Sequence, residues 1–164
     1  VMAIASHGRG LFSANRALPP EGVPLRDLWQ WCTTVREHRG DSHVAALAVL
    51  GISGLEATVL LAIEQGIDLE MFEESRGWHH DHMSGTVERL VKIGLLESRD
   101  RLSDAGRKLR VEVEDMTDRQ AFVVVSRLAL EYEAVLAVLE SAAARIREQH
   151  EIPFPNPMGL DRPS

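Results

Sequence analysis

Apolar positions recur at helical spacing along most of the chain from Pro24 onward. The first such run places apolar side chains on one helical face, at Leu25, Leu28, Trp29, Cys32 and Val35. We expect this helix to end near Gly40. Asp41 or Ser42 is then placed to cap a second helix, because a short side-chain oxygen can accept from the unpaired amides of a first turn. That second helix, HVAALAVLG, is apolar nearly all round and is expected to be buried.

Capping residues and glycines mark the next two helices. Ser53 opens the segment GLEATVLLAIEQG, which Gly66 ends. Asp68 is expected to cap the short segment LEMFEESRG, which Gly77 ends.

A further helix and a short hairpin follow. The helix covers roughly His80 to Ile93 and ends at Gly94, and its apolar face consists of Met83, Val87, Leu90 and Val91. The segment LLESRDRLSDAG then provides two short extended pieces around a charged turn. Another helix is expected to begin at Ser103 or Asp104.

Both ends of the chain are expected to be irregular. Residues 1–24 contain repeated glycines and prolines that interrupt regular elements. Prolines alternate with other residues in IPFPNPMGLDRPS, which prevents a helix over 151–164. One or two helices precede this tail and carry an apolar stripe of Leu128, Tyr132, Val135, Leu136, Leu139, Ala143 and Ile146. We expect one domain over 25–150.

The order helix, tight turn, helix, small hairpin, helix is typical of a winged helix-turn-helix. The segments VERLVKIGLLES and RLSDAGRKLRVEVE resemble MarR-type regulators, in which a recognition helix ends in a glycine and a hairpin leads into the next helix. The predicted fold class is therefore mainly α, a winged helix-turn-helix with a small β-wing and flanking N- and C-terminal helices. The helix-turn-helix and wing cover about 68–115. The hairpin from Glu97 to Leu102 is shorter than in many MarR-type proteins, which does not favour reading of the minor groove.

A second resemblance extends over more of the chain. The run LWQWCTTVREHRGDSHVAAL, through RGW to LSDAGRKLRVEVEDMTDR, is similar to a bacterial helix-turn-helix family that joins this polar run to a winged helix. This resemblance implies an architecture and no particular reaction.

Composition and cysteine content narrow the class of protein. Apolar residues make up 45% and charged residues 26% of the 164 residues, which is ordinary for a protein with a hydrophobic core. A single cysteine, Cys32, excludes an internal disulfide and favours a reducing compartment. We find no apolar stretch long enough to span a membrane and no secretion signal, so we expect a cytoplasmic protein.

The charge is distributed unevenly along the chain. The formal net charge is −7, but residues 84–110 contain seven basic and four acidic residues, a local charge of +3 that leaves −10 for the rest. A positive segment on an acidic chain is compatible with a local contact to double-stranded DNA.

The predicted recognition helix supplies the candidate DNA contacts. Its outward face carries Ser84, Arg89 and Lys92, which suit DNA, beside Gly85 and Glu88, which do not. We expect Ser84 to reach a base edge, and four cations to contact phosphates: Arg89, Lys92, Arg99 and Arg101.

The run REHRGDSHVAAL provides a candidate ligand site. Ionisable side chains crowd the positions before a very apolar helix, so a small anionic or aromatic ligand could be held by Trp29, Arg36, His38, Arg39, Asp41 and His43. The alternative interpretation is a solvated helix end in which Asp41 is a cap and His43 is a hydrogen-bonded core histidine. Both interpretations stay open at this point.

Metal and catalytic chemistry have little support in the sequence. His79 and His82 in the WHHDH run share a helical face, but a metal site needs three or four convergent ligands, and His38, His43 or His150 would have to supply another. No GxSxG, P-loop or GxGxxG motif is present in the sequence. We therefore expect no enzyme, metal or cofactor.

Two functions from different classes remain. The first is a MarR-like, homodimeric, DNA-binding transcriptional regulator with an effector pocket. The second is a ligand-binding or sequestering protein that keeps the winged-helix shape without binding DNA. The positive segment favours the first, whereas the acidic total and the short hairpin favour the second.

Overall fold

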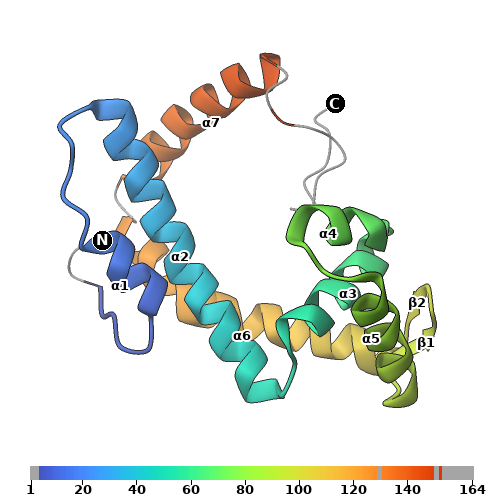
Figure 1. Ribbon diagram of the computed structural model, residues 1–164. Helices are drawn as coiled ribbons and strands as arrows, with labels where there is room; N and C mark the ends of the chain where they lie inside the picture. The colour runs from blue at the N-terminus through green and yellow to red at the C-terminus, as the bar shows by residue number, and fades with distance from the viewer. Residues whose placement is uncertain (1–3, 129–130, 150–151, 153–164) are drawn as a thin grey trace. The chain divides into compact units, whose positions relative to one another are not determined.

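The computed structural model describes residues 4–128, 131–149 and 152, and over this range the chain is mainly helical with one small sheet, as predicted (Figure 1). The chain divides into two compact units. Unit 1 comprises Val1–Ile52 and Val111–Leu130, and unit 2 comprises Ser53–Arg110 and Glu131–Ser164. These units divide the range 25–150 that the sequence analysis treats as one domain.

Unit 1 contains a helix that the sequence analysis does not predict. Helix α1 spans Gly10–Arg16 and packs along α2, so the expectation of an irregular segment over 1–24 was wrong there (Figure 1). Its first turn is capped from outside, since the amide of Phe12 donates to Asp41 Oδ2 at 2.9 Å. The Phe12 ring is fully buried and belongs to a small cluster with Ile4 and Val124. Tertiary packing therefore stabilises this short helix.

Helix α2 spans Pro24–Leu50 without a break, so the predicted end near Gly40 was wrong. Asp41 caps α1 instead of starting a new helix. The Ser42 hydroxyl donates to the carbonyl of His38 at 2.8 Å, a bond within a continuous helix. The helix starts with proline at its first position and ends at Gly51, whose φ of 69° is left-handed.

Unit 2 contains the helices that the capping pattern predicts. Helix α3 spans Gly54–Gln65, α4 spans Leu69–Arg76 and α5 spans His80–Lys92. Ser53 and Glu56 form a reciprocal capping box on α3, and the Asp68 side chain caps α4. The core of the unit consists of Val59, Leu60, Ala62, Phe72, Met83, Val87, Leu90, Leu96 and Leu102.

A two-stranded antiparallel hairpin connects α5 to α6. Strand β1 spans Leu96–Ser98 and β2 spans Arg101–Leu102, with Leu96 opposite Leu102. Helix α6 then spans Asp104–Leu128. A Cβ on Gly106 would lie 2.1 Å from the carbonyl oxygen of Leu95, so only glycine allows this close approach.

Helix α7 spans Tyr132–Glu148, and none of its residues is buried. The side chain of Leu128, the residue His150 and nearly all of the expected irregular tail over 151–164 lie outside the described residues. No single helix in the described ranges combines the length and apolar composition needed to cross a membrane.

Candidate nucleic-acid interface

Helices α4 and α5 are joined by a tight turn of residues 77–79, in which Gly77 has a left-handed φ of 68°. The inward face of α5 is fixed by three buried apolar residues, Met83, Val87 and Leu90. Val91, which we expected on this face, is 36% exposed and lies outside the core cluster. The turn and the apolar face together determine which side of α5 is free for a partner.

The opposite side of α5 carries the predicted polar residues. Glu88, Arg89 and Lys92 are exposed, while Ser84 is half-buried with its hydroxyl donating to the carbonyl of Asp81 at 3.3 Å. Lys92 has no ion-pair partner within the described part of the chain. Its ammonium group is therefore available to an anion.

Arg89 has a different environment from the one predicted. Its guanidinium contacts Glu56 of α3, with Nε donating to Oε1 at 2.6 Å, and the Glu56 side chain is only 5% exposed. Burial opposes ionisation of this carboxyl, but the hydrogen bonds from Ser53 and the Arg89 guanidinium hold the pKa of Glu56 below its ordinary value of 4.5. Arg89 therefore ties α5 to α3, and a phosphate could attract it only by leaving a buried carboxylate without its cation.

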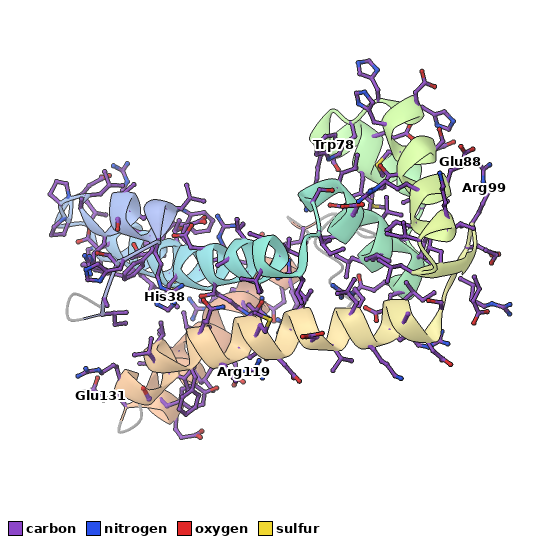
Figure 2. The ribbon with its side chains drawn as sticks, turned by 90° about the horizontal axis from the view of Figure 1, so that it is seen from below. His38, Trp78, Glu88, Arg99, Arg119 and Glu131 are labelled. Carbon is purple, nitrogen blue, oxygen red and sulfur yellow. The ribbon has the colours of Figure 1, made fainter. Side chains whose placement is uncertain are left out.

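The two hairpin arginines are held by exposed carboxylates, and Figure 2 labels one of these pairs, Arg99 and Glu88. Arg99 Nη2 donates to Glu88 Oε1 of α5 at 2.8 Å, and Arg101 Nε lies 2.6 Å from Glu97 Oε2 within the hairpin. Exposed pairs of this kind contribute only about 0–1 kcal/mol, so a phosphate competes with the carboxylate for each guanidinium. In the same turn, the Ser98 hydroxyl holds the pKa of Asp100 below its ordinary value, so Asp100 stays ionised beside the arginines.

The other cations of the positive segment are mostly paired as well. Arg107 contacts Asp104 at 2.7 Å, and Arg110 contacts Glu64 at 2.8 Å. Lys108 is exposed and, like Lys92, has no ion pair among the described residues. The local charge of +3 counts residues 84–110 only. Arg89 and Arg110 of this segment are paired with Glu56 and Glu64, which lie outside it, so less positive charge is free to meet DNA.

The candidate ligand residues occupy different faces of α2. His38 is fully buried in a T-shaped contact with the Phe12 ring, with centroids 4.9 Å apart. Neither ring nitrogen of His38 has a hydrogen-bond partner in the described part of the chain. Burial and, after it, the Arg9 guanidinium hold the pKa of His38 below its ordinary value of 6.5, against the opposing charge of Asp41. His38 is thus held neutral inside unit 1.

The remaining candidates of this set have other partners. Arg36 contacts Glu37 at 2.5 Å, and Arg39 contacts Glu114 and Asp118 of α6 at 2.7 and 3.1 Å. His43 Nδ1 lies 3.3 Å from the hydroxyl of Thr117.

Trp29 is 74% exposed and lies at the surface of α2. Arg36 and Arg39, the two cations predicted to hold an anion, both contact carboxylates. The structure does not bring the six residues together.

The histidines at the start of α5 lie at the surface. His80 contacts Glu73 at 3.1 Å, and the rings of His79 and His82 meet edge to face. Over the described ranges, no group of three or more histidine, cysteine, aspartate or glutamate side chains is placed to hold a metal ion.

Comparison with known proteins agrees with the helix, turn and helix of unit 2. No curated protein and no solved structure matches the chain. Residues 1–153 match a helix-turn-helix family, which covers most of the sequence. The chain therefore belongs to this helix-turn-helix family.

Proposed function

We propose that the protein is a DNA-binding transcriptional regulator of the MarR type. In this proposal α5 is the recognition helix and the β1–β2 hairpin is the wing. The observation that carries the proposal is the outward face of α5, which presents the exposed side chain of Lys92. Glu88 of the same helix contacts Arg99 of the wing, so the helix and the wing are adjacent. Helices presented in this way enter the major groove of DNA.

The proposed DNA contacts differ in how easily each cation leaves its carboxylate partner in the protein. Lys92 is free to neutralise a phosphate, and Arg101 can exchange its exposed carboxylate for one. Arg99 reaches a phosphate only when it leaves Glu88. Arg89 acts as a positioning residue that fixes α5 on α3 through Glu56. Ser84 is the proposed contact to a base edge, which requires its hydroxyl to leave the Asp81 carbonyl.

We also propose that the regulator is a homodimer formed through its terminal helices. Helix α7 leaves apolar side chains such as Val138 and Ile146 exposed, at 61% and 48%. Leu25 and Trp29 of α2 are 75% and 74% exposed. A second copy would cover these side chains, and two recognition helices would then read two half-sites.

The alternative is a ligand-binding or sequestering protein that does not bind DNA. It is favoured by the ion pairs of the positive segment and by the net charge of −7. An effector site remains a prediction from the sequence.

The test is binding to a labelled duplex of random sequence across a range of salt concentrations. Binding at low salt should weaken steeply as salt rises, and Lys92→Ala should reduce the slope of log affinity against log salt by about 0.9, the value for one phosphate contact. This variant should unfold like the wild type, because Lys92 has no ion pair in the described ranges. Arg89→Ala is the contrasting variant. It should lower the free energy of unfolding by about 1–3 kcal/mol, because it leaves the buried carboxylate of Glu56 without its cation. No binding of any duplex at low salt would favour the alternative function.

A further inference from the structure

The outward face of α5 carries a carboxylate, Glu88, that binds an arginine of the wing, Arg99. Glu88 Oε1 accepts from Arg99 Nη2 at 2.8 Å, and the two side chains are 69% and 68% exposed (Figure 2). Both groups lie on the surface that we propose for the DNA backbone. The carboxylate and a DNA phosphate would therefore compete for one guanidinium.

This pair differs from the two others that hold predicted DNA contacts. Arg89 is bound to the buried carboxylate of Glu56, so that pair is part of the core of unit 2. Arg101 is bound to Glu97 within the hairpin itself. Of these three pairs, only that of Glu88 and Arg99 joins the recognition helix to the wing through two exposed side chains.

Arg99 has no second acidic partner in the described part of the chain. Its neighbour Asp100 accepts a hydrogen bond from the Ser98 hydroxyl at 2.6 Å. Removing the charge of Glu88 would therefore leave the Arg99 guanidinium without an ion pair.

We propose that Glu88 restrains binding to DNA of arbitrary sequence by holding Arg99 on the recognition helix. The proposal rests on the DNA-binding function proposed above. Non-specific affinity comes from phosphates that are neutralised with release of counterions, and an arginine that stays on a carboxylate releases none. Glu88 therefore removes one phosphate contact from non-specific complexes, and it sets how strongly the protein discriminates against random sequence.

The experiment compares Glu88→Gln with the wild type in binding of a labelled random duplex between about 50 and 200 mM salt. Glu88→Gln should bind more tightly at low salt, and its log–log slope should be steeper by about 0.9. Over this fourfold range of salt, its affinity should fall about 3.5-fold more than that of the wild type. Glu70→Gln, which removes an exposed carboxylate of α4 that has no ion pair in the described ranges, is the matched control and should keep the wild-type slope.

The double variant Glu88→Gln, Arg99→Ala identifies the route of the effect. In the Arg99→Ala background, Glu88→Gln should add nothing to the slope, because the guanidinium that it frees is absent. An equal gain in both backgrounds would overturn the proposal, since it would come from lost repulsion between Glu88 and phosphate. An unchanged Glu88→Gln slope on a duplex that the wild type binds would overturn the proposal but leave the DNA-binding function intact. If neither protein binds at low salt, both proposals fail.

Discussion

His38 is the polar side chain that the core of unit 1 accommodates least well. It is fully buried, and its ring nitrogens have no hydrogen-bond partner among the residues that the structure describes. A buried polar group without a partner costs about 1–3 kcal/mol. Arg9 donates to the His38 carbonyl at 3.2 Å, and its charge opposes protonation of the ring.

The free energy of unfolding should therefore depend on pH through His38. Because burial, and then Arg9, lowers the pKa of His38 in the folded chain, the unfolded chain binds the proton more tightly. The stability that neutral His38 allows should be fully present above the ordinary pKa of 6.5, and the free energy of unfolding should decrease as the pH falls below this value. His38→Leu should weaken this dependence and raise the free energy of unfolding at pH 7.5 by about 1 kcal/mol. Urea unfolding at a series of pH values measures both effects.

His82→Gln is the control for this experiment, since His82 is exposed on α5. It should keep the wild-type pH dependence. A His38→Leu variant that loses stability below pH 6.5 as steeply as the wild type would contradict the assignment.

At the scale of elements, the features that the sequence predicts are those encoded within a few residues. The capping box of Ser53 and Glu56 and the glycine ends of α3 and α4 each lie within one helical turn, so their pattern is readable directly. The apolar face of α5 is likewise local, apart from its edge at Val91.

The features that the sequence does not predict depend on contacts between distant segments. Asp41 caps α1 across 29 residues, which both explains that helix and removes the expected break in α2. Arg89 meets Glu56 across 33 residues, which turns a predicted phosphate contact into a structural ion pair. A capping residue or a free cation can be recognised in the sequence, but its partner in the fold cannot.

The junction of the hairpin and α6 gives a prediction at this scale. Gly106→Ala would place a Cβ 2.1 Å from the carbonyl oxygen of Leu95. This distance is too short for two non-bonded atoms, so the backbone at this junction would have to move. We expect the free energy of unfolding to fall by about 3 kcal/mol. Gly85→Ala on α5 meets no atom within 4 Å and should instead raise it by about 0.5–1 kcal/mol, because alanine favours a helix. Thermal unfolding of both variants tests the junction, and a neutral Gly106→Ala would contradict it.

At the scale of the whole molecule, the uncovered apolar side chains predict self-association. No residue of α7 is buried, and large apolar side chains of α2 are exposed as well. Sedimentation at micromolar concentration should give twice the chain mass of 18.2 kDa. Val138→Glu should shift the protein toward monomer, because a charge would lie in the interface. A wild-type monomer at this concentration would contradict reading of two half-sites.

The acidic total charge also has a consequence for the whole molecule. With a net charge of −7, we expect most of the surface to repel DNA and contact to be restricted to the outward face of α5 and the hairpin. We therefore expect DNA to meet α5 and the wing and no other part of the described chain.

The most direct measurement is the map of backbone amide chemical shifts on titration with a DNA duplex at low salt. The shifts that change should cluster at Glu88, Lys92 and the hairpin residues 97–101, and they should revert as salt is added. Amides around Trp29 and His43 should stay unchanged. Changes confined to unit 1, or no change at any duplex concentration, would contradict the account.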